Sequence, residues 1–234
     1  MFHAAARGLA DALFGGSCFL CRGATSRGTL CEGCMTDLPR LPSERCPRCA
    51  MPSAGAQPCG RCLASPPRFD STRAALVFAF PADVLVHALK YRGELALAGL
   101  AAGLLGECLD EGDRVDAIVP VPLSDARMRE RGYNQAMEIA RHVARARGIV
   151  LAPAICERVR DTPAQAALPF AGRAANVRGA FRCPTPVAGQ TIAVLDDVMT
   201  TGATLDEVAS TLKRAGAARV VNWVLARTLP MADV

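Results

Sequence analysis

The chain has 234 residues, of which 51% are hydrophobic, 21% are charged and 5% are aromatic. This composition predicts a globular protein with one full domain and room for a smaller one, and it excludes a disordered polyelectrolyte. The net charge is +5, and residues 1–69 carry +4 of it through eight arginines against four acidic residues. Taken alone, that excess predicts a basic arm of the kind that seeks nucleic acid.

No segment predicts a membrane span or a secretion signal. The longest uncharged apolar run covers 12 residues, 95–106, whereas a span needs about 18. Arg7 and Asp11 interrupt the N-terminal apolar stretch, so we expect no signal peptide. These observations predict a cytoplasmic protein without membrane insertion, in which cysteines stay reduced or bind metal.

A short amphipathic helix is predicted over 3–14, and a cysteine repeat follows it. Four C-x2-C pairs follow one another along the chain. Nine residues separate the first pair from the second, and nine separate the third from the fourth. Each cysteine of the first two pairs recurs 28 positions later. Two such pairs aim four sulfurs at a common centre, which is the tetrahedral thiolate site that zinc prefers. The expected ligands of two structural Zn²⁺ sites are Cys18, Cys21, Cys31, Cys34, Cys46, Cys49, Cys59 and Cys62.

Disulfides, iron–sulfur clusters and interleaved pairing are the alternatives for this repeat. The expected compartment disfavours disulfides, regular ribbon duplication is more typical of zinc, and the 28-residue period favours two ribbons in sequence. Metal binding also changes the charge. Eight thiolates and two Zn²⁺ add −4, so residues 1–69 become neutral, the chain carries +1, and the basic arm disappears.

After a linker over 64–68, predicted strands and helices alternate. Strands are predicted over 74–80, 115–121, 149–151, 155–159, 191–195 and 220–226, and helices over 82–91, 94–110, 124–147 (broken near 131–132) and 204–215. This alternation predicts an α/β fold with a mainly parallel sheet flanked by helices, and ligands at the carboxyl ends of its strands. The expected units are a short helix over 1–16, a double zinc ribbon over 17–66 and an α/β domain over 70–234.

The segment 192–204, I-A-V-L-D-D-V-M-T-T-G-A-T, joins a buried strand, two adjacent carboxylates and a hydroxyl- and glycine-rich turn that opens a helix. Loop amides and threonine hydroxyls favour an anion, and Gly202 permits close backbone approach. Asp196 and Asp197 stand beside this anion site, so the ligand must also bring hydroxyls or a metal. A ribose 5-phosphate brings a phosphate and hydroxyls together.

These thirteen residues are similar, at every position, to the phosphoribosyl pyrophosphate (PRPP) signature of type I phosphoribosyltransferases. Preceded by a cysteine-rich ribbon, they resemble the ComF family of competence proteins, and the resemblance covers about 17–227. Many members of that family keep one ribbon, so the second marks a subgroup. Weaker strings add to it: L-K-Y-R-G at 89–93, P-V-P-L at 120–123 with Arg127, R-G-Y-N-Q at 131–135, and Gln165-x2-Leu168 with Arg173 and Asn176.

The resemblance implies a type I phosphoribosyltransferase fold and a reaction in which a nitrogen nucleophile displaces pyrophosphate from PRPP with Mg²⁺. It implies that Asp196 and Asp197 hold the ribose hydroxyls and the metal shell. Residues 160–178 fit a mobile loop that covers the site. The implied catalytic set is Asp196, Asp197, Arg127, Arg131 and Lys90; the implied PRPP-binding set is Asp196, Asp197, Val198, Met199, Thr200, Thr201, Gly202, Ala203, Thr204, Pro122, Leu123 and Ser124.

The sequence does not indicate the nucleophile, so three functions stay open. The chain is a phosphoribosyltransferase of nucleoside metabolism, a PRPP-binding regulator without turnover, or a competence factor that handles single-stranded DNA. The link to DNA uptake, with a competence helicase as partner, is implied by the resemblance alone. No residue indicates the oligomeric state.

Overall fold

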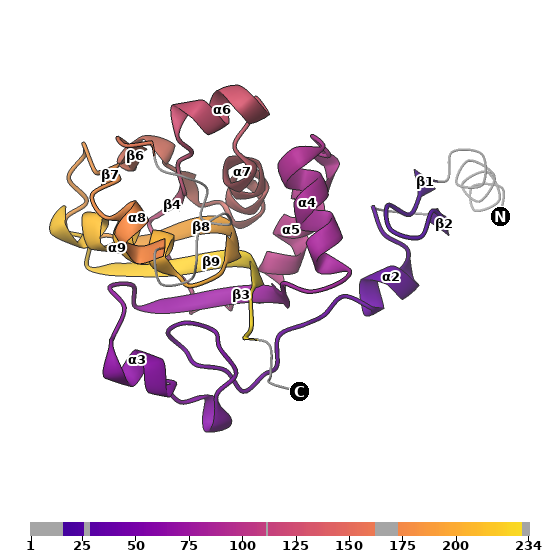
Figure 1. Cartoon of the computed structure of the whole chain (residues 1–234), viewed down its shortest axis with the longest axis horizontal. Coiled ribbons are helices and arrows are strands. Elements are labelled where there is room, and N and C mark those ends of the chain that lie inside the picture. The colour runs from indigo at the N-terminus through magenta and orange to yellow at the C-terminus, as the bar shows by residue number, and fades with distance from the viewer. Residues whose placement is uncertain (1–15, 26–28, 111, 162–172, 231–234) are drawn as a thin grey trace.

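The structure is a computed structural model that describes residues 16–25, 29–110, 112–161 and 173–230 (Figure 1). The helix expected over 3–14 and most of the covering loop expected over 160–178 lie outside these residues. Among the described residues, no helix is both long enough and apolar enough to cross a membrane.

A five-stranded sheet forms the centre of the molecule. In spatial order its strands are β3 (Ser71–Val77), β9 (Arg219–Arg227), β8 (Thr191–Met199), β4 (Ala117–Pro120) and β5 (Val150–Leu151). All four pairings are parallel, as the alternation of elements predicts. The expected fold class, a parallel sheet flanked by helices behind two cysteine ribbons, is confirmed.

Helices cover both faces of the sheet. They are α4 (Ala82–Tyr91), α5 (Ala96–Gly106), α6 (Asp125–Arg131), α7 (Gln135–Arg147), α8 (Arg173–Val177) and α9 (Ala203–Arg214). Side chains of α4, α5 and α7 share an apolar cluster with Leu195, whereas those of α9 share another with Val194. Because neighbouring residues of a strand face opposite sides, β8 is buried on both faces, which explains its continuous apolar run. A short antiparallel pair of β6 (Glu157–Arg158) and β7 (Phe181–Arg182), with a 3-10 turn over Pro153–Ile155, completes this unit.

The strands differ from their expected bounds, two of them by three or more residues at one or both ends, because pairing partners distant in sequence decide where they begin and end. The strand expected over 74–80 runs from Ser71 to Val77, since Ser71 already pairs with Val221 of β9. The strand expected to stop at Leu195 continues to Met199, which pairs with Arg227. The break expected near 131–132 is present, and Gly132 adopts a positive φ of 76° between α6 and α7.

The eight repeat cysteines form two groups of four, in the sequential pairing that the 28-residue period favours. Within each group the sulfur atoms all lie within 4.8 Å of one another. The first ribbon contains β1 (Gly16–Ser17), β2 (Ala24–Thr25) and α2 (Glu32–Thr36), and the second contains a 3-10 turn (Ala54–Ala56) and α3 (Gly60–Ala64). The geometry and the all-sulfur donor set fit two structural Zn²⁺ ions.

The first cysteine of each ribbon lies in a matching electrostatic environment. Burial works to raise the pKa of Cys18, but backbone N–H groups outweigh it and lower this pKa to about 6. The equivalent Cys46 shows the same balance, with a pKa lowered to about 7. Both thiols are therefore stabilised as thiolates, the form that binds metal.

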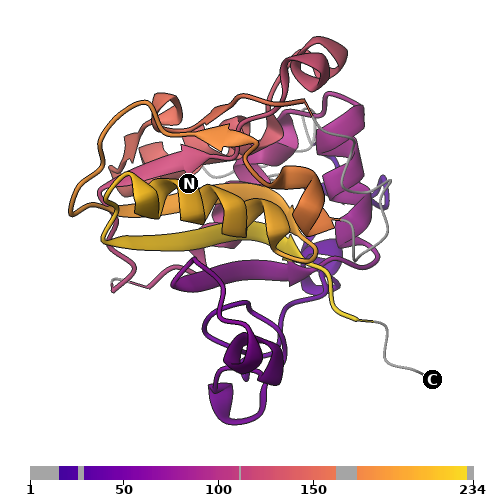
Figure 2. The same cartoon turned by 60° about the vertical axis from the view of Figure 1, so that its left-hand side comes forward.

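The two ribbons occupy different places on the α/β unit. Figure 1 shows the first beyond α4 and α5, and Figure 2 shows the second below β3. The chain between them follows the open edge of β3: the Val77 amide donates to the Pro39 carbonyl at 2.7 Å, and Arg40 bridges to Leu76. This covering segment protects an edge strand that would otherwise invite pairing with another chain.

We expect the purified chain to contain two zinc ions, because each cysteine group supplies a complete four-thiolate site. Cys31→Ser with Cys34→Ser should remove one zinc, and Cys59→Ser with Cys62→Ser should remove the other. Elemental analysis per chain measures this directly. A wild-type content of one zinc, or a double variant that still holds two, would contradict the two-site arrangement.

Candidate functional site

A cavity of about 260 Å³ opens at the carboxyl ends of β4 and β8. These strands are neighbours in the sheet, and Pro120 pairs with Leu195, so the segments that follow them meet at one edge. The end of β8 and its loop to α9 form one wall, and the turn after β4 with α6 forms another. The C-terminal part of α4 closes a third side.

Two carboxylates and one ammonium lie at the base of this cavity. Lys90 Nζ lies 2.9 Å from Asp197 Oδ2, and the two side chains are only 21% and 5% exposed. Burial works to raise the pKa of Asp197, but the Lys90 charge and hydrogen bond outweigh it and lower this pKa. The same pairing raises the pKa of Lys90 against its burial. Lys90 and Asp197 are therefore a charged pair at neutral pH.

Asp196 lies in the opposite situation. Burial, followed by the charge of Asp197, raises the pKa of Asp196 to about 7, although Lys90 opposes the shift. Within the described residues Asp196 forms no ion pair of its own, since Lys90 pairs with Asp197. A ligand hydroxyl or a divalent cation at this position would favour its charged form.

The loop between β8 and α9 supplies an anion site beside the carboxylates. Gly202 precedes α9 with a φ of +87°, a conformation that other residues rarely adopt. A Cβ at Gly202 would lie 2.7 Å from the terminal methyl of Met199, which would have to move, so the positive φ is the main reason for glycine here. The amides of the first turn of α9 and the loop before it form the kind of helix N-terminus that binds phosphate.

Three arginines of the cavity wall repel one another. Burial and then the charge of Arg131 lower the pKa of Arg127, while burial and then Arg127 lower the pKa of Arg158. Among the described residues, the buried Arg127 Nη2 and Arg131 Nε atoms find no hydrogen-bond acceptor. Arginines gathered on one cavity wall, with acceptor-free N–H groups on Arg127 and Arg131, are suited to a ligand with several negative charges.

Aromatic rings line the mouth on the α4 side. The His87 ring lies 6.4 Å from that of Phe78 and 5.6 Å from that of Tyr91, measured between centroids. The Arg131 guanidinium lies 5.0 Å from the centroid of the Tyr91 ring, and Tyr91 is 59% exposed. This side of the cavity therefore offers flat, partly exposed rings next to positive charge.

The cavity gathers nearly all of the residues in the implied catalytic and PRPP-binding sets. Ser124 is the exception: it is buried at the start of α6 and is not among the lining residues. Those that do line the cavity are Lys90, Pro122, Leu123, Arg127, Arg131, Asp196, Asp197, Val198, Met199, Thr200, Thr201, Gly202, Ala203 and Thr204.

Two functional residues lack a role in the sequence analysis. Gln135, at the start of α7, hydrogen-bonds Asp197 and accepts from Arg131 Nη1 at 3.1 Å, so it joins the carboxylates to the arginines. Its place is set by Asn134, which caps α7 and donates to the Val121 carbonyl at 3.0 Å. Arg227, the last residue of β9, is 1% exposed and contacts the loop from below. In the sequence, the feature that could have marked Arg227 as a candidate is a charged residue at the end of a buried strand.

The two aspartates should affect stability in opposite ways in ligand-free protein without divalent cations. The pKa of Asp196 is raised to about 7 by folding, so this group makes folding less favourable as the pH rises from about 4 towards 7. Asp196→Asn should therefore raise the Tm at pH 8, by at least the roughly 2 °C that 1 kcal/mol gives in a chain of this size, and should raise it less at pH 5.

Asp197→Asn is the matched variant. The folded pKa of Asp197 is lowered, so its charge stabilises the fold at both pH values, and the variant leaves the Lys90 ammonium without its partner. We expect a lower Tm at pH 5 and at pH 8 in thermal melts. Equal effects of the two substitutions, or a loss at pH 8 for Asp196→Asn, would contradict this electrostatic arrangement.

Comparisons with known proteins agree with both parts of the chain. Residues 9–63 match the family model described as a double zinc ribbon domain. The chain is 39% identical over 224 residues to DNA utilization protein YhgH of Salmonella typhimurium, covering 92% of this chain and 98% of that protein. It is 30% identical over 222 residues to competence protein F of Haemophilus influenzae, covering 90% and 96%.

A solved structure, a purine phosphoribosyltransferase from Pyrococcus horikoshii, has a partial likeness in fold. It is 15% identical, covers 70% of this chain and 95% of its own, and superposes with a TM-score of 0.29. The family assignment depends instead on the sequence relatives, which align with this chain from the ribbons through the α/β unit. The chain belongs to the ComF family, together with competence protein F and DNA utilization protein YhgH.

Proposed function

We propose that this chain binds PRPP, or another ribose 5-phosphate, in the cavity at the end of β8, and that with Mg²⁺ it transfers the phosphoribosyl group with release of pyrophosphate. The observation that carries the proposal is that one cavity joins an anion loop, a buried carboxylate pair and an arginine cluster. A ligand with one phosphate, sugar hydroxyls and a second, more highly charged group matches all three.

Each part of such a ligand has a counterpart in the cavity. The loop at Thr200–Thr204 suits the 5′-phosphate, because the glycine turn and helix N-terminus favour a compact anion. Asp196 and Asp197 suit the ribose 2′- and 3′-hydroxyls as acceptors. The arginines on α6, with the turn after β4, lie across the cavity and suit the pyrophosphate.

The carboxylate pair also fits Mg²⁺, which prefers hard oxygen ligands and usually shares them with substrate phosphates. Asp196 and Asp197 would hold the ion, and its charge would stabilise the leaving pyrophosphate. Lys90 keeps Asp197 ionised before any ligand arrives. Arg127 and Arg131 add fixed positive charge where negative charge develops on the departing group, without reorganisation during the reaction.

Handling of single-stranded DNA is a second candidate, favoured by one feature of the cavity mouth. Tyr91 and the Arg131 guanidinium above it present an exposed ring and a cation together, the combination that stacks bases and neutralises backbone phosphate. The names of the relatives refer to DNA utilization and competence. We also propose a cytoplasmic location, with which both candidate functions are compatible.

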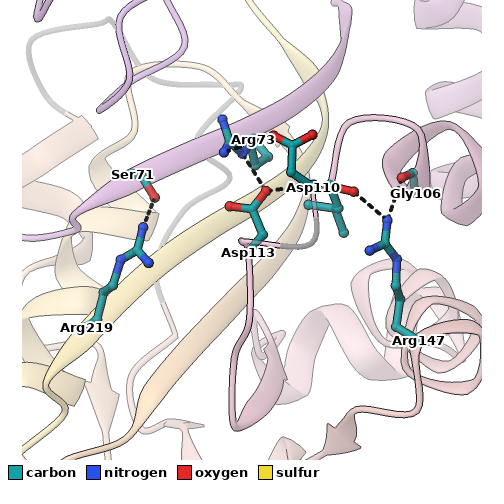
Figure 3. A network of polar contacts seen from close by, with 8 residues as sticks. Ser71, Arg73, Gly106, Asp110, Asp113, Arg147 and Arg219 are labelled. Carbon is teal, nitrogen blue, oxygen red and sulfur yellow. Dashed lines mark hydrogen bonds and ion pairs between the residues drawn. The ribbon is translucent and has the colours of Figure 1, made fainter.

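PRPP with Mg²⁺ should raise the Tm of the wild-type chain, because a ligand that binds only the folded state stabilises it by mass action. At 100 times Kd the gain is about 2.7 kcal/mol, or roughly 5–10 °C for a chain of this size. Asp196→Asn with Asp197→Asn should abolish the shift while both zinc ions remain. The control is Asp110→Asn with Asp113→Asn, a pair of carboxylates in a separate network around Arg73 (Figure 3), which should keep the shift.

Absence of a shift in the wild-type chain would contradict PRPP binding. Pyrophosphate release with a panel of nitrogen nucleophiles then separates an enzyme from a PRPP-binding regulator. For the second candidate, the affinity for a single-stranded oligonucleotide should fall as salt rises and should fall further in Tyr91→Ala. An affinity that is unaffected by salt and by Tyr91→Ala would contradict DNA binding at the mouth of the cavity.

A further inference from the structure

Arg227 connects the anion loop to the second ribbon through its guanidinium group. Its Nε donates to the Cys49 carbonyl at 2.9 Å, and Cys49 belongs to the second cysteine group. Its Nη1 donates to the Met199 carbonyl at 2.9 Å and also to the Thr200 carbonyl. One fully buried side chain therefore contacts a predicted zinc ligand, the last residue of β8 and the first residue of the loop, and its Nη1 is shared with the Thr228 carbonyl at 2.7 Å.

These contacts fix the direction of the loop amides. A trans peptide unit points its C=O and the following N–H in opposite directions. Arg227 contacts the carbonyls of Met199 and Thr200, and the Met199 carbonyl also accepts from the Thr228 amide at 3.0 Å, so the amides of Thr200 and Thr201 point away from Arg227. Both threonines line the cavity, whereas Arg227 does not. The guanidinium thus orients two consecutive N–H groups away from the ribbon, on the side where an anion would bind.

A second contact supports the loop from the same direction. Phe69 is buried, and two of its ring carbons lie 3.8 Å from the position that a Gly202 Cβ would occupy. Phe69 shares an apolar cluster with Cys46, Cys49 and Cys62 on one side and with Met199 and Leu205 on the other. The core of the second ribbon is therefore continuous with the packing beneath the loop.

A third contact ties the end of the ribbon segment to the helix that follows the loop. The Arg68 amide donates to Asp206 Oδ1 at 2.6 Å, and Asp206 lies in the first turn of α9. The loop is thus supported at Met199 and Thr200, beneath Gly202, and at the start of α9. Two of these supports, Phe69 and Arg68, come from the residues directly after the second ribbon, whereas Arg227 belongs to β9 and contacts the ribbon at the Cys49 carbonyl.

The first ribbon provides an internal comparison. Its Cys18 and Leu30 belong to the apolar cluster of α4, α5 and α7, on the other face of the sheet from α9. Its ligand set is the same as that of the second ribbon, four cysteines in two C-x2-C pairs. The two ribbons therefore match in metal chemistry and differ in what they support.

We infer that the second zinc ribbon, acting through Arg227, holds the loop after β8 in its anion-binding conformation, and that the first ribbon does not. Arg227 is a positioning residue, because it acts on the loop backbone from outside the cavity. Zinc at the second site is then a condition for ligand binding as well as for folding of the ribbon. The identity of the ligand rests on the proposed function, whereas the coupling between the second ribbon and the loop does not.

Hydrogen exchange in ligand-free protein tests the coupling. Cys59→Ser with Cys62→Ser should increase deuterium uptake in peptides that cover 198–205, because the zinc that orders Cys49 is lost. Cys31→Ser with Cys34→Ser should leave uptake there unchanged. The single variant Cys59→His keeps a zinc ligand at position 59, so its uptake should equal that of the wild-type chain. Unchanged uptake after loss of the second zinc, or equal effects of the two double variants, would overturn the inference.

Ligand affinity provides the second arm. Arg227→Met should weaken PRPP binding by at least about tenfold, within the range of typical coupling free energies. Arg147→Met is the control: Arg147 also donates to two carbonyls, those of Gly106 and Leu109, each at 2.7 Å, in the separate network of Figure 3. It should lower the Tm and leave the PRPP affinity unchanged.

The two arms separate the inference from the proposed function. A wild-type chain that binds no PRPP refutes the proposed function, and the exchange data still decide whether the second ribbon orders the loop. Normal PRPP binding by Arg227→Met, in a protein that retains both zinc ions, refutes the role of Arg227. A weakening of binding by the Arg147→Met control to the same degree would also refute it, because general destabilisation would then explain both.

Discussion

Asp196 and Asp197 are neighbouring carboxylates at the end of a buried strand, and only one ammonium, that of Lys90, lies close to them. The electrostatics of the cavity depend on this imbalance of charge. Lys90 pairs with Asp197 at 2.9 Å, while burial and the charge of Asp197 raise the pKa of Asp196 to about 7. Across the cavity, Arg127 Nη2 and Arg131 Nε are buried without a hydrogen-bond acceptor among the described residues, and a bound anion would supply one. Unfavourable electrostatics of both signs in one cavity are typical of a binding site, because a bound ligand relieves them.

The parallel sheet brings these groups together. β4 and β8 are neighbours, so the turn after β4 and the loop after β8 share an edge although they are far apart in sequence. Asn134 links α7 to the turn after β4, and Gln135 next to it bridges Arg131 and Asp197. The duplicated ribbon adds a second level of support. One copy packs with the helices of one face, and the other packs with the core beneath the anion loop.

The sequence predicts the features that are local. The cysteine spacing, the 192–204 loop and the helix over 82–91 each depend on residues close together in the chain, and the structure agrees with all three. Features that depend on distant partners are not predictable in this way. The start of β3 at Ser71 depends on β9, and the contact of Arg227 with Cys49 joins residues 178 positions apart. Ser124 is a further case, since its motif is local but its burial in the folded chain does not follow from the motif.

A crystal structure of the full chain with ribose 5-phosphate and Mg²⁺ tests the central claim most directly. The account predicts the phosphate on the amides of the loop between β8 and α9, with the 2′- and 3′-hydroxyls on Asp196 and Asp197. A phosphate bound elsewhere on the chain, or a ribose turned away from the two carboxylates, would contradict it.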